Sequence, residues 1–318
     1  MCQITETEYT YQNKIVALSA SKKTRSPWLL YTKCHGSGNC SNFETIRKFK
    51  EYIEFTEDLT LKFELKGISD GELLSVTIPY THRWKELYRN RTLARFYKFN
   101  DWWVNEGKPP LTMLTLTTYQ DTEYAQINRG ERVSLEDSFR LLAGSWDNLR
   151  KVLHKIRKED GETLEYLRVM EPHESGYPHY HIAVKGSFTK EQQNRLNSLW
   201  SDKYNAGSYA HGLDISDVNT KTDLTYAGFY LFKYLGKSFA KSPEEMTPGE
   251  LLFSSQLWKY KYRQWSASKG IRDAMKLDID TEKRYDLVSV TMHKEGWQKD
   301  ITKLKKSNIL YQSGPSPR

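Results

Sequence analysis

Residues 164–184 have the sequence LEYLRVMEPHESGYPHYHIAV, and this stretch sets the expectation for the fold. Leu164–Glu171 and Pro178–Val184 are rich in aliphatic and aromatic residues, which is typical of strands. Between them, His173–Gly176 (HESG) favours a turn. Apolar side chains alternate along the second strand and fall on one of its faces: Tyr180, Ile182 and Val184. The stretch therefore predicts a β-hairpin with an apolar face.

The elements around this hairpin predict an α+β fold. The patterns indicate a strand, a helix, the two hairpin strands, a helix, a strand and a last helix, in that order. The elements outside the hairpin are Leu111–Thr118, a helix from Ser134, Thr189–Trp200, Gly212–Val218 and Thr222–Lys237. Asp137 lies three residues after Ser134, a variant of the capping box, and an apolar stripe follows: Leu141, Trp146, Leu149 and Leu153. This order is the split βαβ pattern of ferredoxin-like and RNA-recognition-motif-like folds. We expect a central antiparallel sheet with flanking helices and an N-terminal extension.

The rest of the chain carries weaker signals. Short strands are predicted at Leu61–Leu65, Leu73–Ile78 and Tyr285–Met292, and helices at Trp84–Trp103, which is basic, and Pro243–Tyr262. The segment NEGKPP, residues 105–110, combines Gly with two prolines and favours a boundary. We therefore predict three regions: 1–108, 109–270 and 271–318.

Composition restricts the class of protein. The 318 residues hold 48 Lys and Arg against 40 Asp and Glu, a net charge of +8 that favours a polyanionic partner. No apolar run has the roughly 18 residues that a membrane helix needs, so we expect no membrane partner. The first residues, MCQITETEYT, lack the pattern of a secretory signal, and three cysteines make no disulfide framework. We expect a cytoplasmic protein.

The predicted hairpin brings together three possible metal ligands. His179 and His181 project from the same face of a strand, about 7 Å apart at Cα. Glu171 ends the preceding strand, and a register that places it opposite either histidine completes a three-ligand group. A shift of one residue would turn Glu171 to the other face. Such a group suits Mg²⁺ or Mn²⁺, and equally Zn²⁺, whereas the alternative is solvated histidines and a solvated strand end.

A second set of residues lies on the last predicted helix. Tyr226, Tyr230 and Tyr234 recur every four residues on one helical face, and Lys237 follows three residues later. Such a stripe can be core packing, or its hydroxyls can act as nucleophiles near a cation and a metal. The segment LGKS, residues 235–238, resembles the end of a phosphate loop. Leu231 stands where such a loop needs Gly, which excludes that motif.

Basic and aromatic residues interleave in WKYKYRQW, residues 258–265. Lys259, Lys261 and Arg263 can neutralise phosphates while the aromatic rings stack on unpaired bases. The alternative is an amphipathic helix whose aromatic residues belong to the core.

The N-terminal region carries Cys34, His35 and Cys40 in a polar loop. A structural Zn²⁺ site needs four ligands, so it would require Cys2 or a distant histidine as well. The alternative is a pair of reduced thiols.

Three motifs occur in an order that resembles HUH endonucleases: LTMLTLTT (111–118), EPHESGYPHYHI (171–182) and YLFKYLGK (230–237). The sequence is most similar to the two-tyrosine replication initiator (Rep) proteins of rolling-circle plasmids and single-stranded DNA phages. The resemblance covers roughly residues 111–270. It includes YRQWSASKG (262–270), which carries Lys269 and looks like the basic segment that follows the tyrosine helix in such initiators.

The resemblance implies a role for each matched residue. His179, His181 and Glu171 would bind the divalent metal, Mg²⁺ or Mn²⁺. Tyr230 and Tyr234 would be the paired nucleophiles and Lys237 the lysine that follows them. From the basic and aromatic pattern itself, we expect the DNA-binding residues to be Lys259, Lys261, Arg263 and Lys269. Residues 109–270 would be the endonuclease domain, between an N-terminal accessory or DNA-binding region and a C-terminal extension.

The resemblance also implies an activity. We expect an enzyme that initiates rolling-circle replication by site-specific nicking and joining of single-stranded DNA through a 5′-phosphotyrosine. Its partners would be single-stranded and origin DNA, with a host helicase and polymerase, in the host cytoplasm if the gene is viral or plasmid-borne. One alternative is a two-tyrosine transposase, and another is a non-catalytic DNA-binding repressor.

Overall fold

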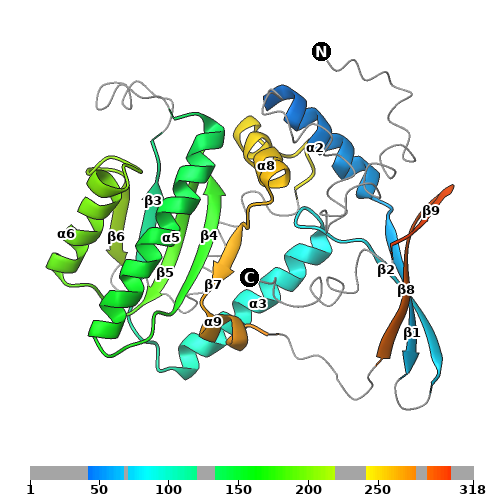
Figure 1. Cartoon of the computed structure of the whole chain (residues 1–318), viewed down its shortest axis with the longest axis horizontal. Coiled ribbons are helices and arrows are strands. Elements are labelled where there is room, and N and C mark those ends of the chain that lie inside the picture. Colours follow the sequence, from blue (N-terminus) through cyan, green and yellow to red (C-terminus); the bar gives the residue numbers. More distant parts are fainter. Residues whose placement is uncertain (1–41, 68–70, 120–132, 219–240, 277–284, 302–318) are drawn as a thin grey trace. The chain divides into compact units, whose positions relative to one another are not determined.

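The computed structural model describes residues 42–67, 71–119, 133–218, 241–276 and 285–301, in two compact units (Figure 1). One unit comprises Met1–His82 with Asp278–Arg318, and the other Arg83–Leu277. The boundary that the sequence suggests at 108 and 109 falls inside the second unit. The reason is that the helix α3 (Glu86–Asn105) shares a hydrophobic core with the strands that follow it.

The second unit is built on a five-stranded sheet with the order β6-β3-β5-β4-β7, in which every neighbouring pair is antiparallel. The strands are β3 (Leu111–Thr117), β4 (Tyr166–Pro172), β5 (Pro178–Lys185), β6 (Leu213–Asp217) and β7 (Trp265–Ala267). Because β5 lies between β3 and β4, the split βαβ arrangement and the α+β class are confirmed. The edge strand β7 was not predicted.

Helix α5 (Leu135–Glu159) covers one face of this sheet, and its N-cap is the predicted one. The hydroxyl of Ser134 accepts a hydrogen bond from the backbone N–H of Asp137. The apolar stripe of α5 contains Leu142, which is fully buried, in place of the predicted Leu141. The ring of Trp146 on α5 contacts Tyr180 on β5 edge to face, with 6.4 Å between ring centroids. The predicted apolar face of β5 is therefore confirmed as a core face.

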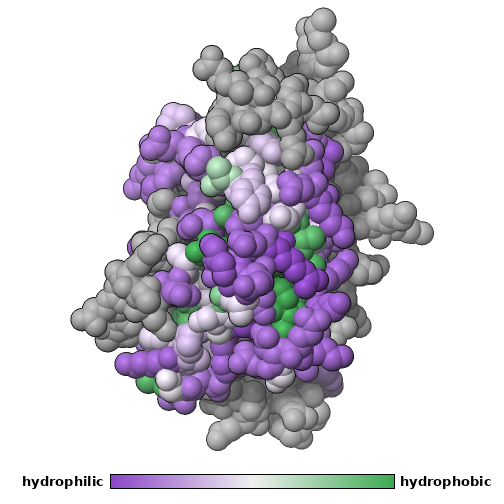
Figure 2. Space-filling view, turned by 90° about the vertical axis from the view of Figure 1, so that its left-hand side faces the viewer, coloured by the Kyte–Doolittle hydropathy of each residue, from purple (hydrophilic) through white to green (hydrophobic). Residues whose placement is uncertain are grey.

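The second predicted helix divides into two elements. Thr189 and Gln192 form a capping box at the start of α6 (Lys190–Ser198), and a π-helical turn, η3 (Leu199–Lys203), continues it. The outward side that carries α6 is mostly hydrophilic, with small hydrophobic patches (Figure 2).

The opposite face of the sheet is half apolar and half polar. Its apolar half packs against α3 and α9 (Lys269–Ala274) in one core. That core includes Phe96, Phe99 and Trp103 of α3, Ile271 of α9, and Met113, Val169 and Ala183 of the sheet. Helix α8 (Pro248–Tyr260) starts five residues later than predicted, because Thr247 and Glu250 form its capping box.

The first unit contains α2 (Asn42–Thr56) and a four-stranded antiparallel sheet of order β2-β1-β8-β9. The strands are β1 (Thr60–Gly67), β2 (Leu73–Pro79), β8 (Tyr285–Lys294) and β9 (Trp297–Asp300). The three predicted strands of this region are confirmed, whereas α2 and β9 were not predicted. The sheet joins residues that are more than 200 positions apart in the chain.

Two sequence predictions fall outside the described residues: the helix Thr222–Lys237 and the cysteine loop around Cys34 and Cys40. They stay predictions. Within the ranges that the structure describes, no helix combines the length and the apolar character needed to cross a bilayer.

Candidate metal centre

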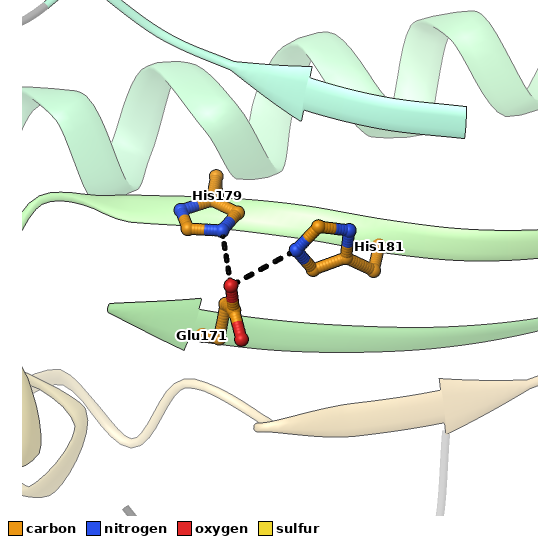
Figure 3. A group of neighbouring side chains, drawn as sticks. All are labelled: Glu171, His179 and His181. Carbon is orange, nitrogen blue, oxygen red and sulfur yellow. Dashed lines mark hydrogen bonds and ion pairs between the residues drawn. The ribbon is translucent and has the colours of Figure 1, made fainter. Parts of the chain in front are cut away.

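The structure brings the three predicted ligands together on the polar half of the sheet (Figure 3). Glu171 on β4 is directly opposite His179 on β5, and His181 lies two residues further along the same face. Oε1 of Glu171 is 2.7 Å from Nε2 of His179 and 3.0 Å from Nε2 of His181. One donor atom from each residue lies within 4.8 Å of the other two. We call these three residues the triad.

The β4–β5 turn fixes this register. The backbone N–H of His173 donates to the carbonyl of Tyr177, and that of Gly176 donates to the carbonyl of His173. Gly176 has φ = +85°, a conformation that favours glycine. The paired prolines Pro172 and Pro178 close the ladder, since proline has no N–H to donate. A shift of one residue would move Glu171 to the α5 side, so this turn determines whether the triad exists.

The triad is largely shielded from solvent. Glu171 is 2% and His181 7% exposed, and the side chain of His179 is 12% exposed. Burial raises the pKa of Glu171, but hydrogen bonds from His179 and His181 and their charge outweigh it and set this pKa to about 2. The carboxylate is therefore ionised at neutral pH. A buried anion of this kind needs a cation or hydrogen-bond donors beside it.

The donor set fits a divalent metal ion. Two imidazole nitrogens and a carboxylate oxygen are ligands that Mn²⁺ and Zn²⁺ accept readily, and that Mg²⁺ accepts with additional water. Three protein ligands leave coordination positions for water or a substrate oxygen. The structure thus supports a metal-binding group, and the donor set does not select one metal.

Thr115 adds a contact that the sequence did not single out. It lies on β3 directly opposite His181, and its hydroxyl is 3.2 Å from Nδ1 of that histidine. A hydrogen bond at Nδ1 orients the ring so that Nε2 points at Glu171. The alternation of Thr115 and Thr117 with leucines was the available signal, since it places both hydroxyls on the face of the histidines.

His173 stays outside the triad. It is exposed in the turn, and its ring centroid lies 6.3 Å from that of His179. The predicted turn at His173–Gly176 is confirmed.

The remaining predicted site residues have different surroundings. Tyr230, Tyr234 and Lys237 lie outside the described residues. Lys259 is largely buried, with its side chain 10% exposed and its ammonium 3.9 Å from a carboxylate oxygen of Glu136. Exposed cations follow it along the chain: Lys261, Arg263 and Lys269. Contact of these residues with DNA stays a prediction.

The segment that holds the triad matches a known protein family. Residues 111–239 match the model of the replication-associated protein ORF2 family. This is a family of replication initiators, so the match supports a role in DNA replication with DNA as a partner. The matched range begins at the first residue of β3 and includes the triad, Tyr230, Tyr234 and Lys237.

A curated relative is the "Uncharacterized 36 kDa protein" of Halobacterium salinarum, which is 29% identical over 189 residues. The aligned part is 54% of this chain and 57% of the relative, so the chain spans little more than half of that protein's length. No solved structure matches the chain.

Proposed function

We propose that this protein initiates rolling-circle replication by nicking and rejoining single-stranded DNA through a tyrosine nucleophile. The observation that carries the proposal is the buried triad at the centre of the segment that matches the replication-associated family. A shielded group of this donor type suits phosphodiester cleavage, because a bound divalent ion would polarise the phosphate.

The described residues that flank 219–240 bear on the choice of a tyrosine nucleophile. At one end, the N–H of Val218 donates to the carbonyl of Leu111, at the end of β3 far from the triad. At the other end, Nζ of Lys241 is 2.7 Å from Oε1 of Glu250 in the first turn of α8. That turn lies against the β4–β5 turn, since a Cβ built on Gly249 would be 2.1 Å from the carbonyl oxygen of Glu174.

The described residues Val218 and Lys241 therefore lie at different ends of the sheet. The six steps from Leu111 to Thr117 span about 20 Å in a strand. If the segment is helical, as its sequence predicts, the twelve residues from Val218 to Tyr230 advance about 18 Å. The two lengths are similar, which supports Tyr230 and Tyr234 as candidates for the nucleophile.

The chemistry assigned to these residues is a phosphoryl transfer. The hydroxyl oxygen of Tyr230 or Tyr234 would lose its proton and attack the scissile phosphorus, and the 3′ oxygen would leave and take up a proton. The products are a 5′-phosphotyrosine and a free 3′ hydroxyl that a host polymerase can extend. Lys237 would stabilise the phenolate, and the second tyrosine would cleave the regenerated site. Rejoining needs no ATP, because the phosphotyrosine keeps the energy of the broken bond.

A host helicase would separate the strands, and we place the reaction in the cytoplasm. A two-tyrosine transposase would use the same chemistry on the ends of a mobile element. The proposal differs from that alternative in its substrate, which is a replication origin.

The test is formation of a covalent protein–DNA adduct. The full-length protein is incubated with Mn²⁺ and a pool of single-stranded oligonucleotides that tile its replicon, and adducts are resolved on a denaturing gel. We expect an adduct with Mn²⁺ and none with EDTA or with the His179→Ala/His181→Ala variant. Binding of the pool without any adduct would favour the repressor alternative and contradict the proposal.

A further inference from the structure

Strand β2 forms one edge of the sheet in the first unit, and no other described strand pairs with its outer side. Its seven residues, LLSVTIP (73–79), carry no charge. Leu73 is 69%, Leu74 38% and Ile78 36% exposed. Edge strands of soluble proteins usually carry charges, bulges or internal prolines, because a bare edge pairs with other chains. Here the pairing with β1 has no bulge and the proline is the last residue, so the edge lacks these protections.

The hydrogen bonds between β2 and β1 show which backbone groups of β2 face outward. At one end of the ladder, the N–H of Gly67 donates to the carbonyl of Glu72. At the other end, the N–H of Tyr80 donates to the carbonyl of Leu59. Backbone groups alternate in direction along an antiparallel strand, so the even-numbered residues of β2 bond to β1 and the odd-numbered ones face outward. The outward N–H groups belong to three residues: Leu73, Ser75 and Thr77.

A second copy of β2 has the backbone groups that match this edge. If two antiparallel copies are related by a two-fold axis at Val76, Ser75 of each copy is opposite Thr77 of the other. These two residues then exchange both of their N–H···O bonds. Leu73 donates to the carbonyl of Pro79 at the end of the pair, where the missing N–H of proline costs least. Every outward N–H of β2 thus has an acceptor on the second copy.

The charges on β1 favour this position of the axis. Lys62 pairs with Thr77 and Glu64 with Ser75, and the ammonium of Lys62 is 2.8 Å from Oε1 of Glu64. With the axis at Val76, each row across the joined strands has Lys62 of one copy at one end and Glu64 of the other copy at the other end. An axis at Ser75 would instead place Glu64 at both ends of a row, and an axis at Thr77 would place Lys62 at both ends. Like charges in one row repel, whereas opposite charges attract.

The other face of these strands is apolar and continues across the same axis. Leu61 pairs with Ile78 and Leu65 with Leu74. Leu61 is 2% exposed and belongs to the core, whereas Leu74 and Ile78 are the exposed ends of the apolar rows. A second copy places Leu74 opposite Ile78 of its partner, so both side chains lose contact with water. Such cross-strand apolar pairs stabilise a sheet.

We propose that β2 is a dimerisation edge, at which two copies of this chain pair antiparallel about a two-fold axis at Val76. The four described strands of each first unit then form one continuous sheet of eight. A two-fold interface uses the same surface on both copies, so pairing through β2 stops at two. The proposal does not depend on the nicking activity, and the dimer carries two copies of the triad.

Sedimentation equilibrium of the full-length protein over a range of concentrations tests the dimer. We expect a mass of about twice the 37.4 kDa of one chain. Thr77→Pro removes an outward N–H and leaves the ladder with β1 intact, since proline is tolerated on the free side of an edge strand. The dimer loses two hydrogen bonds by symmetry, so its dissociation constant should rise about 30-fold. Thr77→Ala is the matched control, because it changes the same exposed side chain and keeps the N–H.

Cysteine crosslinking tests the position of the axis. The three native cysteines, Cys2, Cys34 and Cys40, are first replaced by serine. Val76→Cys should then form an intermolecular disulfide under mild oxidation, because facing residues of a non-hydrogen-bonded pair have Cα atoms about 4.5 Å apart. Leu74→Cys is the control. Its counterpart on the second copy would lie about 13 Å away along the strand, too far for a disulfide.

Three results would overturn the proposal. A wild-type protein that stays monomeric at its highest soluble concentration would assign this edge to another occupant. A dimer that Thr77→Pro leaves unchanged would place the interface elsewhere. Crosslinking of Leu74→Cys as fast as Val76→Cys would contradict the two-fold axis. Circular dichroism checks the fold of Thr77→Pro, and if this variant does not fold, the two cysteine variants decide.

Discussion

Thr115 and His181 are directly opposite each other on β3 and β5, with 3.2 Å between the threonine hydroxyl and Nδ1 of the histidine. The other ring nitrogen, Nε2, is the one that points at Glu171. Thr115 on β3 thus orients His181, a possible metal ligand on β5, without itself belonging to the triad. Partners of this kind affect metal affinity through the ligand that they orient.

We expect Thr115→Val to weaken Mn²⁺ binding about tenfold, because valine keeps the shape of threonine and removes only the hydroxyl. Isothermal titration of the metal-free protein measures the change. Thr117→Val is the matched control, since Thr117 lies on the same face opposite His179 and makes no hydrogen bond with the triad in the structure. Equal affinities for the two variants would show that the Thr115 hydroxyl does not orient His181.

Metal binding should stabilise the fold. At a free Mn²⁺ concentration of about 100 times the dissociation constant, the gain is about 2.7 kcal/mol. For a unit of this size that raises the melting temperature by roughly 5–10 °C. Calorimetry with Mn²⁺ and with EDTA measures the shift. We expect no shift in His179→Ala/His181→Ala and the full shift in His173→Ala, whose exposed side chain lies outside the triad. Loss of the shift in His173→Ala would show that His173 is a fourth metal ligand.

The charge of Glu171 should make stability depend on pH. Its folded pKa of about 2 lies below the ordinary value of 4.5, so ionisation favours the folded state above pH 4.5. That contribution, roughly 3 kcal/mol at most, is lost as the pH falls from 4.5 toward 2. Urea unfolding in EDTA should therefore show a steeper loss below pH 4.5 for the wild type than for Glu171→Gln. Parallel pH profiles would contradict the charge assignment.

The hairpin was predictable because each of its signals is local. Strand periodicity, two prolines and a turn glycine lie within 21 residues, and together they determine the register that faces Glu171 toward the histidines. The cap at Ser134 was local as well. The stripe on α5 was predicted less well, since Leu141 and Leu142 are adjacent and only packing against the sheet selects Leu142.

The remaining features depend on contacts between distant parts of the chain. Strand β7 has three residues, too few for a period, and it forms because the edge of β4 is available to pair with it. The sequence favoured a boundary before Leu111, yet Phe99 of α3 belongs to the core of the later sheet.

Gly249 should be essential for the position of α8 beside the β4–β5 turn. A Cβ at this residue would be 2.1 Å from the carbonyl oxygen of Glu174, so Gly249→Ala must displace the helix or the turn. We expect a loss of about 1–3 kcal/mol in the free energy of unfolding, measured with urea. Gly144→Ala on α5 is the control. Nothing lies within 4 Å of its added Cβ, and alanine in a helix should stabilise by roughly 0.5–1 kcal/mol. Similar values for the two variants would contradict the close approach.

The tyrosine pair gives the sharpest test of the proposed mechanism. On a helix, Tyr230 and Tyr234 are one turn apart, so their hydroxyls can alternate at the same phosphate. Tyr226 is a further turn away, about 6 Å along the axis. Tyr230→Phe and Tyr234→Phe should each keep part of the cleavage of single-stranded DNA, because the other hydroxyl can attack.

The double variant should form no adduct, since phenylalanine keeps the ring and removes only the nucleophilic oxygen. Tyr226→Phe is the control, because it makes the same substitution on the same predicted helix face. This variant should cleave DNA like the wild type. Mass spectrometry of the trapped peptide identifies the modified residue. An adduct on Tyr226, or cleavage that survives in the double variant, would show that the nucleophile is not the Tyr230–Tyr234 pair, whereas the triad's metal affinity would be unaffected by either outcome.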